Sequence, residues 1–75
     1  MVEILKKITE NLNKDNLDKA YDLCEKNLEK KIEHIISNIK GVILFKKQKF
    51  KSAESEFLKS IQLDNNFIDP YKNLL

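Results

Sequence analysis

The sequence contains very few of the residues that break helices or cross-link chains. Its 75 residues include one glycine, one proline and one cysteine, and tryptophan is absent. The scarcity of glycine and proline leaves few sites for hairpin turns, so the composition argues against a fold built from β-hairpins and favours helix. A single cysteine cannot form a disulfide within the chain.

Segments typical of secretion or membrane insertion are missing too. The chain begins Met-Val-Glu-Ile, without the charged and then apolar order of a leader, and no apolar run approaches the length that crosses a bilayer. Together with the lone cysteine, these absences lead us to expect a soluble cytoplasmic protein with no membrane partner.

Arginine is also absent, so all fourteen basic residues are lysines, and the net charge is only +2. Without guanidinium groups the chain lacks the bidentate donors that read guanine edges and phosphates. The densest basic cluster is Lys46, Lys47, Lys49 and Lys51. It fits a solvated turn between two helices better than a phosphate-binding patch, so nucleic acid is not an expected partner.

Apolar residues recur at helical spacing in four segments separated by short polar stretches. The segments cover approximately residues 2–12, 16–29, 32–46 and 49–62. Asn13, Asp15 and Asn16 are suited to cap the second helix. Asp69 offers an N-cap and Pro70 suits the first position of a helix, which predicts a fifth helix. On the second helix, acid–base pairs four residues apart are expected on the solvated face: Asp15 with Lys19, and Asp22 with Lys26.

The second and fourth segments match each other when one is shifted by 33 positions. The inward positions that coincide are Leu17 with Phe50, Ala20 with Ala53, Cys24 with Phe57, and Leu28 with Ile61. A repeat of this length with two helices in each unit is typical of an α-solenoid.

Residues 37–66 resemble the tetratricopeptide repeat, a helix–turn–helix unit of about 34 residues with the pattern W-x2-L-G-x2-Y, then A-x3-F, then P. The matching residues are Gly41, Leu44, Ala53 and Phe57, with Phe50 as the aromatic that opens the second helix. The exit Leu-Asp-Asn-Asn at 63–66 is similar to the family's Leu-Asp-Pro-Asn, and Tyr71 and Leu74 are similar to the start of another unit. Residues 1–33 match less closely, with Ile8 in place of the glycine, and Lys40 departs from the leucine of the pattern.

The resemblance implies an all-α fold, in which antiparallel helix–turn–helix repeats stack as a short right-handed α-solenoid of four helices plus a short terminal fifth. Residues 1–75 would form one domain: a divergent first repeat at 1–33, a second at 34–67, and the start of a third or a capping helix at 68–75. Two units and part of a third are few for this architecture, so we expect the N-terminal part of a longer repeat or multidomain protein.

Gly41 interrupts an apolar helical run, where glycine costs about 1 kcal/mol relative to alanine. Small residues allow two helix backbones to approach closely. We therefore expect Gly41 to meet Ala53 across the hairpin, with Leu44, Phe50 and Phe57 filling the space around them.

The family resemblance implies a non-catalytic protein-interaction module, whose first helices line a concave groove for a peptide or a partner's helix. By position, the groove residues would be Leu5, Thr9, Asn38, Val42, Phe45, Lys46 and Lys72. The family's carboxylate clamp of lysine, asparagine and arginine is missing, because Leu5, Thr9, Ile39, Asp69 and Asn73 stand at the matching places. Val42 and Phe45 also fit the core against a neighbouring helix.

No enzyme activity, metal or cofactor is predicted. Cys24 and His34 are too isolated for a metal site, and we expect a buried thiol at Cys24 and a surface imidazole at His34. Two other functions are open. One is a homodimer formed through the exposed end at Tyr71, Leu74 and Leu75. The other, disfavoured by the missing arginine, is a small basic helical domain that binds nucleic acid.

Overall fold

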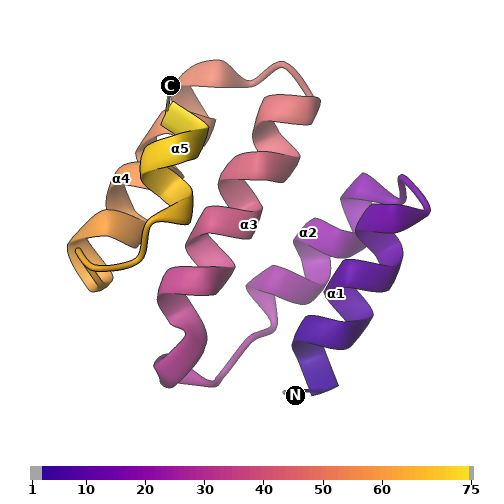
Figure 1. Ribbon diagram of the computed structural model, residues 1–75. Coiled ribbons are helices and arrows are strands. Elements are labelled where there is room, and N and C mark those ends of the chain that lie inside the picture. Colours follow the sequence, from indigo (N-terminus) through magenta and orange to yellow (C-terminus); the bar gives the residue numbers. More distant parts are fainter. Residues whose placement is uncertain (1–2, 75) are drawn as a thin grey trace.

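A computed structural model describes residues 3–74, and the expected all-α class is confirmed over this range (Figure 1). The helices are α1 (Glu3–Asn13), α2 (Leu17–Glu25), the 3-10 turn η1 (Lys30–Ile32), α3 (Glu33–Lys46), α4 (Phe50–Leu63) and α5 (Asp69–Leu74). The expected first helix position Val2 and the terminal Leu75 lie outside the described residues, as does the side chain of Leu74.

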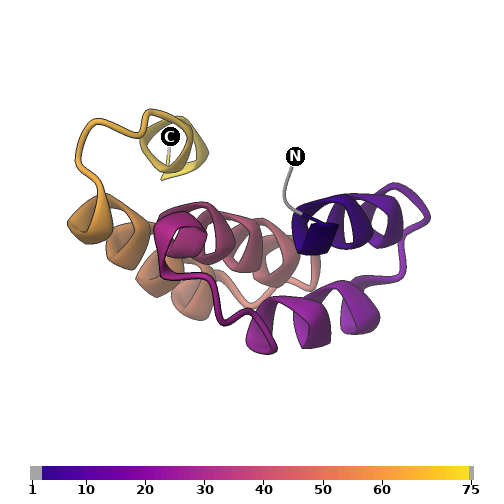
Figure 2. The ribbon, with the colours of Figure 1, turned by 90° about the horizontal axis from the view of Figure 1, so that it is seen from below.

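The helices form two hairpins, α1 with α2 and α3 with α4, followed by the short α5 (Figure 1). Figure 2 shows α1, α3 and α5 on one side of the molecule, with α2 and α4 on the other. Helix α3 is central, because it contacts α2, α4 and α5. Odd-numbered and even-numbered helices thus form two separate layers.

Two apolar clusters hold these layers together. The larger joins α1, α2 and α3 through the buried residues Ile8, Ala20, Cys24, Ile32, Ile36 and Ile43. The smaller joins α3 and α4 through Leu44, Ala53 and Phe57. Tyr21 packs against both clusters, so its ring connects the two hairpins.

The two hairpin turns have the same backbone geometry. The second residue after each helix end has a positive φ, 62° at Asp15 and 64° at Gln48. The next amide reaches back to the last turn of the helix, at 2.8 Å from Asn16 N to Asn11 O and 2.9 Å from Lys49 N to Leu44 O. This is a Schellman ending, and the corresponding residues of the two turns lie 33 positions apart, which is the length of the internal repeat.

Gly41 lies close to α4, although its nearest neighbour differs from the expected one. A Cβ at Gly41 would lie 2.4 Å from Cε1 of Phe57, so the ring of Phe57, rather than Ala53, occupies the space that glycine leaves. Phe50 does not fill this contact, because 55% of it is exposed. The expectation that Phe50 points inward is therefore wrong.

The second helix ends earlier than its apolar pattern predicts. Helix α2 stops at Glu25, and Leu28 is 94% exposed, so the expectation of an inward Leu28 is wrong. The side chain of Asn27 bonds to the backbone of Glu29 in both directions, at 3.0 Å through Nδ2 and 3.2 Å through Oδ1. Such local bonds give the backbone an alternative to continuing the helix.

The remaining local expectations have mixed outcomes. Asn16 stands at the start of α2 as expected, but its side chain makes no capping bond. The pair between Asp22 and Lys26 forms at 3.0 Å, whereas Asp15 lies in the turn before α2 begins. His34 is not a surface residue, since its side chain is 21% exposed and stacks edge-on against Phe67.

Candidate functional site: an apolar hollow at the end of α3

Four of the seven predicted groove residues line one hollow of about 590 Å³ at the end of α3. Its lining comes from the last turn of α3, the α3–α4 turn, two turns of α4 and the end of α5. The residues are Val42, Phe45, Lys46, Gln48, Phe50, Phe57, Lys72 and Asn73. Val42, Phe45, Lys46 and Lys72 were predicted to lie in one groove, and the structure brings them together here.

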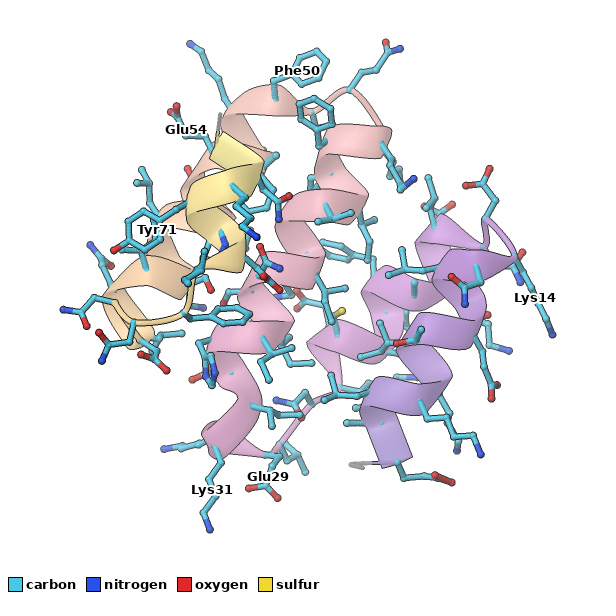
Figure 3. The ribbon with its side chains drawn as sticks, in the orientation of Figure 1. Lys14, Glu29, Lys31, Phe50, Glu54 and Tyr71 are labelled. Carbon is cyan, nitrogen blue, oxygen red and sulfur yellow. The ribbon has the colours of Figure 1, made fainter. Side chains whose placement is uncertain are left out.

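Aromatic rings form much of the hollow. Phe45 and Phe50 are each 55% exposed, and their rings meet edge to face at a centroid distance of 5.1 Å. Phe57 is buried and also lines the hollow. The tight α3–α4 turn brings the two rings together, because Phe45 lies in the last turn of α3 and Phe50 begins α4. Figure 3 shows Phe50 at this end of the molecule.

The charged residues in this lining are both lysines, Lys46 and Lys72. An adjoining hollow of about 160 Å³ shares Phe45, Phe50 and Phe57 and adds Glu54 from α4. Figure 3 shows Glu54 on the same helix as Phe50, below it along α4. The larger hollow is therefore apolar with a positive rim, and one carboxylate stands outside it.

The other three predicted groove residues lie elsewhere. Leu5 packs against the larger apolar cluster, and the hydroxyl of Thr9 donates to the carbonyl of Leu5 at 2.8 Å. Asn38 is 7% exposed, and its Oδ1 accepts a hydrogen bond of 2.8 Å from Nδ2 of Asn73. Asn38 thus connects α3 to α5 and holds the side of the hollow formed by α5.

Sequence reasoning missed Gln48, Phe50 and Asn73 as lining residues. The apolar pattern predicts Phe50 in the core, and repeat position places Asn73 only where the family has a residue of its carboxylate clamp. Their places depend on where the Schellman turn directs the start of α4 and on where α5 docks. Neither can be read from the spacing of apolar residues alone.

A second hollow, of about 510 Å³, lies over α2 and α4. Its lining is mainly polar and of mixed charge, and comprises Asp18, Tyr21, Leu44, Lys47, Lys49, Ser52, Ser55 and Glu56. Asp18 pairs with Lys47 across it, and this hydrogen-bonded charge holds the pKa of Asp18 below its usual range. The two charges satisfy each other, which leaves this hollow without a dominant sign.

Lys40 forms an ion pair between the two hairpins. Its Nζ lies 2.5 Å from Oε1 of Glu25 and 5.4 Å from the centre of the Tyr21 ring. Burial opposes the charged form of Lys40, but the hydrogen bond to Glu25 and nearby carboxylates outweigh it, so the pKa of Lys40 is raised. The same burial raises the pKa of Tyr21.

Cys24 has the buried position expected from the sequence, at 2% exposure. Burial raises the pKa of its thiol to about 12, so the thiolate is scarce at neutral pH. Within residues 3–74 no three His, Cys, Asp or Glu side chains gather closely enough to hold a metal ion. Over the same range no helix has both the length and the apolar character needed to cross a membrane.

Comparison with known proteins gave no further assignment: no family model, curated protein or solved structure matches the chain.

Proposed function

We propose that the chain is a non-catalytic protein-interaction module of the tetratricopeptide-like class, which binds a peptide or a helix of a partner protein on the side formed by α1, α3 and α5. The observation that carries the proposal is the apolar hollow at the end of α3, where Val42, Phe45, Lys46 and Lys72 meet. Repeat position alone predicts that these four residues lie in one groove.

Two features of the backbone support the repeat interpretation. The α1–α2 and α3–α4 hairpins share one turn geometry with a shift of 33 residues. The first helix of each hairpin lies in the same layer, and α5 joins that layer (Figure 2). In a solenoid of helical hairpins, this layer is the one that presents a continuous binding surface.

Selection of random peptides displayed on phage against the immobilised 75-residue chain tests the proposal. We expect enrichment of a related set of sequences that bind the free chain in solution with micromolar to millimolar dissociation constants. Failure to enrich any sequence, while a control target carried through the same rounds gives binders, would overturn the proposal.

Self-association is the second candidate function, and exposed apolar residues near α5 favour it. Ile68 is 61% exposed and Tyr71 is 43% exposed, on the segment that ends the chain. A homodimer through this segment predicts a mass that rises with concentration in sedimentation velocity. A monomer over a hundredfold concentration range would exclude this alternative and leave the hollow beside α3 as the candidate site.

A further inference from the structure

Two aromatic side chains of the apolar hollow are largely exposed to solvent. Phe45 and Phe50 contact each other, yet more than half of each side chain remains open to solvent. Contiguous exposed apolar surface of this kind marks a site of interaction. The volume, about 590 Å³, is within the range of about 300–1,000 Å³ found for ligand pockets.

The two lysines at this hollow are available to a partner. Three other lysines form ion pairs within the molecule: Lys26 with Asp22, Lys40 with Glu25, and Lys47 with Asp18. Among the ion pairs of residues 3–74, neither Lys46 nor Lys72 takes part. No carboxylate contributes to the lining of this hollow. The charged lining of this hollow is therefore positive, with Glu54 in the adjoining hollow, and such a lining favours negative charge in whatever binds.

From this juxtaposition we propose that the hollow binds an acidic peptide segment, with one large apolar side chain seated against Phe45 and Phe50 and flanking carboxylates paired with Lys46 and Lys72. The inference rests on the proposed function and specifies the chemistry of its ligand. Lys46 at the end of α3 and Lys72 on α5 bring charge to the hollow from two different helices. Carboxylates on both sides of the apolar anchor meet that arrangement.

A peptide fits these observations better than a membrane or a duplex. Binding to a membrane surface requires a helix with a continuous exposed apolar face. On α3, by contrast, Ile36, Ile43 and Leu44 are buried in the two apolar clusters. The two most exposed aromatic side chains, Phe45 and Phe50, both lie at the α3–α4 end. Two lysines are also few for the phosphate contacts of a duplex.

Three fluorescently labelled hexapeptides test the inference by polarisation at low salt. They are Asp-Glu-Phe-Leu-Asp-Glu, its basic counterpart Lys-Lys-Phe-Leu-Lys-Lys, and the anchor-free Asp-Glu-Ser-Ser-Asp-Glu. We expect the first to bind about tenfold more tightly than either of the others, because it alone combines the apolar anchor with negative charge.

Matched variants of the full chain locate the binding. The double variant Lys46→Glu with Lys72→Glu should weaken binding of the acidic apolar peptide about tenfold or more. The control double variant, Lys31→Glu with Lys59→Glu, makes an equal charge change at exposed lysines away from the hollow and should change the affinity by less than about twofold. Phe45→Ser should weaken binding of the acidic apolar peptide about as much as the Lys46 and Lys72 double variant. Its control, Leu58→Ser, alters a side chain of comparable exposure on α4.

Three outcomes would overturn the inference. The first is equal affinity for the acidic and the basic apolar peptide. The second is an equal loss of affinity for the acidic apolar peptide in the two double lysine variants. The third is tight binding to phosphatidylserine vesicles or duplex DNA with no binding of the acidic apolar peptide. None of these outcomes refutes the proposed function, because peptides from the unbiased library can still bind elsewhere on the α1, α3 and α5 side. Circular dichroism of each variant separates lost binding from lost folding.

Discussion

Replacing Gly41 with alanine tests how α3 packs on α4, because the local and tertiary effects have opposite signs. In a solvated helix the change stabilises by about 1 kcal/mol. In the folded chain, the new Cβ would lie 2.4, 2.6 and 2.8 Å from Cε1, Cδ1 and Cζ of Phe57. These distances are far below the ordinary contact between carbon atoms, about 3.5–4.0 Å, so the ring must move.

The expected net effect is a loss of stability. Phe57 is 3% exposed and packs with Leu44 and Ala53, so its ring can yield only toward the hollow that it lines. Overpacking of a core costs about 1–3 kcal/mol. A value near the middle, about 2 kcal/mol, less the gain of about 1 kcal/mol in helix propensity, leaves a net loss of about 1 kcal/mol. For a chain of this size that loss lowers Tm by about 4–8 °C.

Thermal and urea unfolding followed by far-ultraviolet circular dichroism measures this loss. A second background, Phe57→Leu, removes the ring that the new methyl group meets and serves as the control. In that background Gly41→Ala should stabilise the chain by up to about 1 kcal/mol, because only the helix propensity remains. A higher Tm for Gly41→Ala in the wild-type chain would refute the close approach of Gly41 to Phe57.

Three further predictions concern the turns, the attachment of α5 and acid stability. Gln48→Gly should raise the free energy of unfolding in urea by about 0.5–1 kcal/mol, because Gln48 has a positive φ that glycine adopts freely. A lower free energy of unfolding would contradict the Schellman turn. Asn38→Ala should speed amide hydrogen exchange in α5 more than in α4, since it removes the hydrogen bond from Asn73; equal changes would argue against this link. Pairing with Lys47 lowers the pKa of Asp18, so the pair stabilises the fold at pH values above the ordinary aspartate pKa, and this stabilisation is lost as pH falls through the lowered pKa. Asp18→Asn should therefore reduce Tm at neutral pH but not in strong acid. An equal reduction of Tm at both pH values would refute the pairing.

The helices and their order were predictable from the sequence because apolar spacing and polar breaks coincide along this chain. The apolar pattern predicts the third helix over residues 32–46, and α3 covers Glu33–Lys46. Helical periodicity also predicts the buried positions of Ala20, Cys24, Ala53 and Phe57. The repeat of 33 residues also predicted two equivalent hairpins. It did not predict that both would close with a non-glycine residue at positive φ, since neither Asp15 nor Gln48 is the glycine usual at that position.

Where local side-chain chemistry decides, the pattern was insufficient. The 33-residue repeat aligns Asn27 with Ser60, yet the two side chains make different hydrogen bonds and only α2 ends near its residue. Asn27 bonds to the nearby backbone at Glu29 as α2 ends, whereas Ser60 donates to the carbonyl of His34 at 2.5 Å and α4 continues. The bond from Ser60 is a tertiary contact that no periodicity reveals.

The candidate site was predictable in part for the same reason. Repeat positions gave Val42, Phe45, Lys46 and Lys72, because residues on one helical layer follow from spacing. Phe50 was missed because the repeat aligns it with Leu17. Leu17 is half-buried against the larger cluster, whereas Phe50 is 55% exposed beside Phe45 at the α3–α4 turn.

The most direct test of the central claim is a map of backbone amide shifts in the ¹⁵N-labelled chain, titrated with the tightest peptide from the display selection. The account predicts that the largest shifts lie in residues 42–50 and 71–73, which surround the apolar hollow. Largest shifts in residues 18–22 and 52–56, around the polar hollow over α2 and α4, would contradict it.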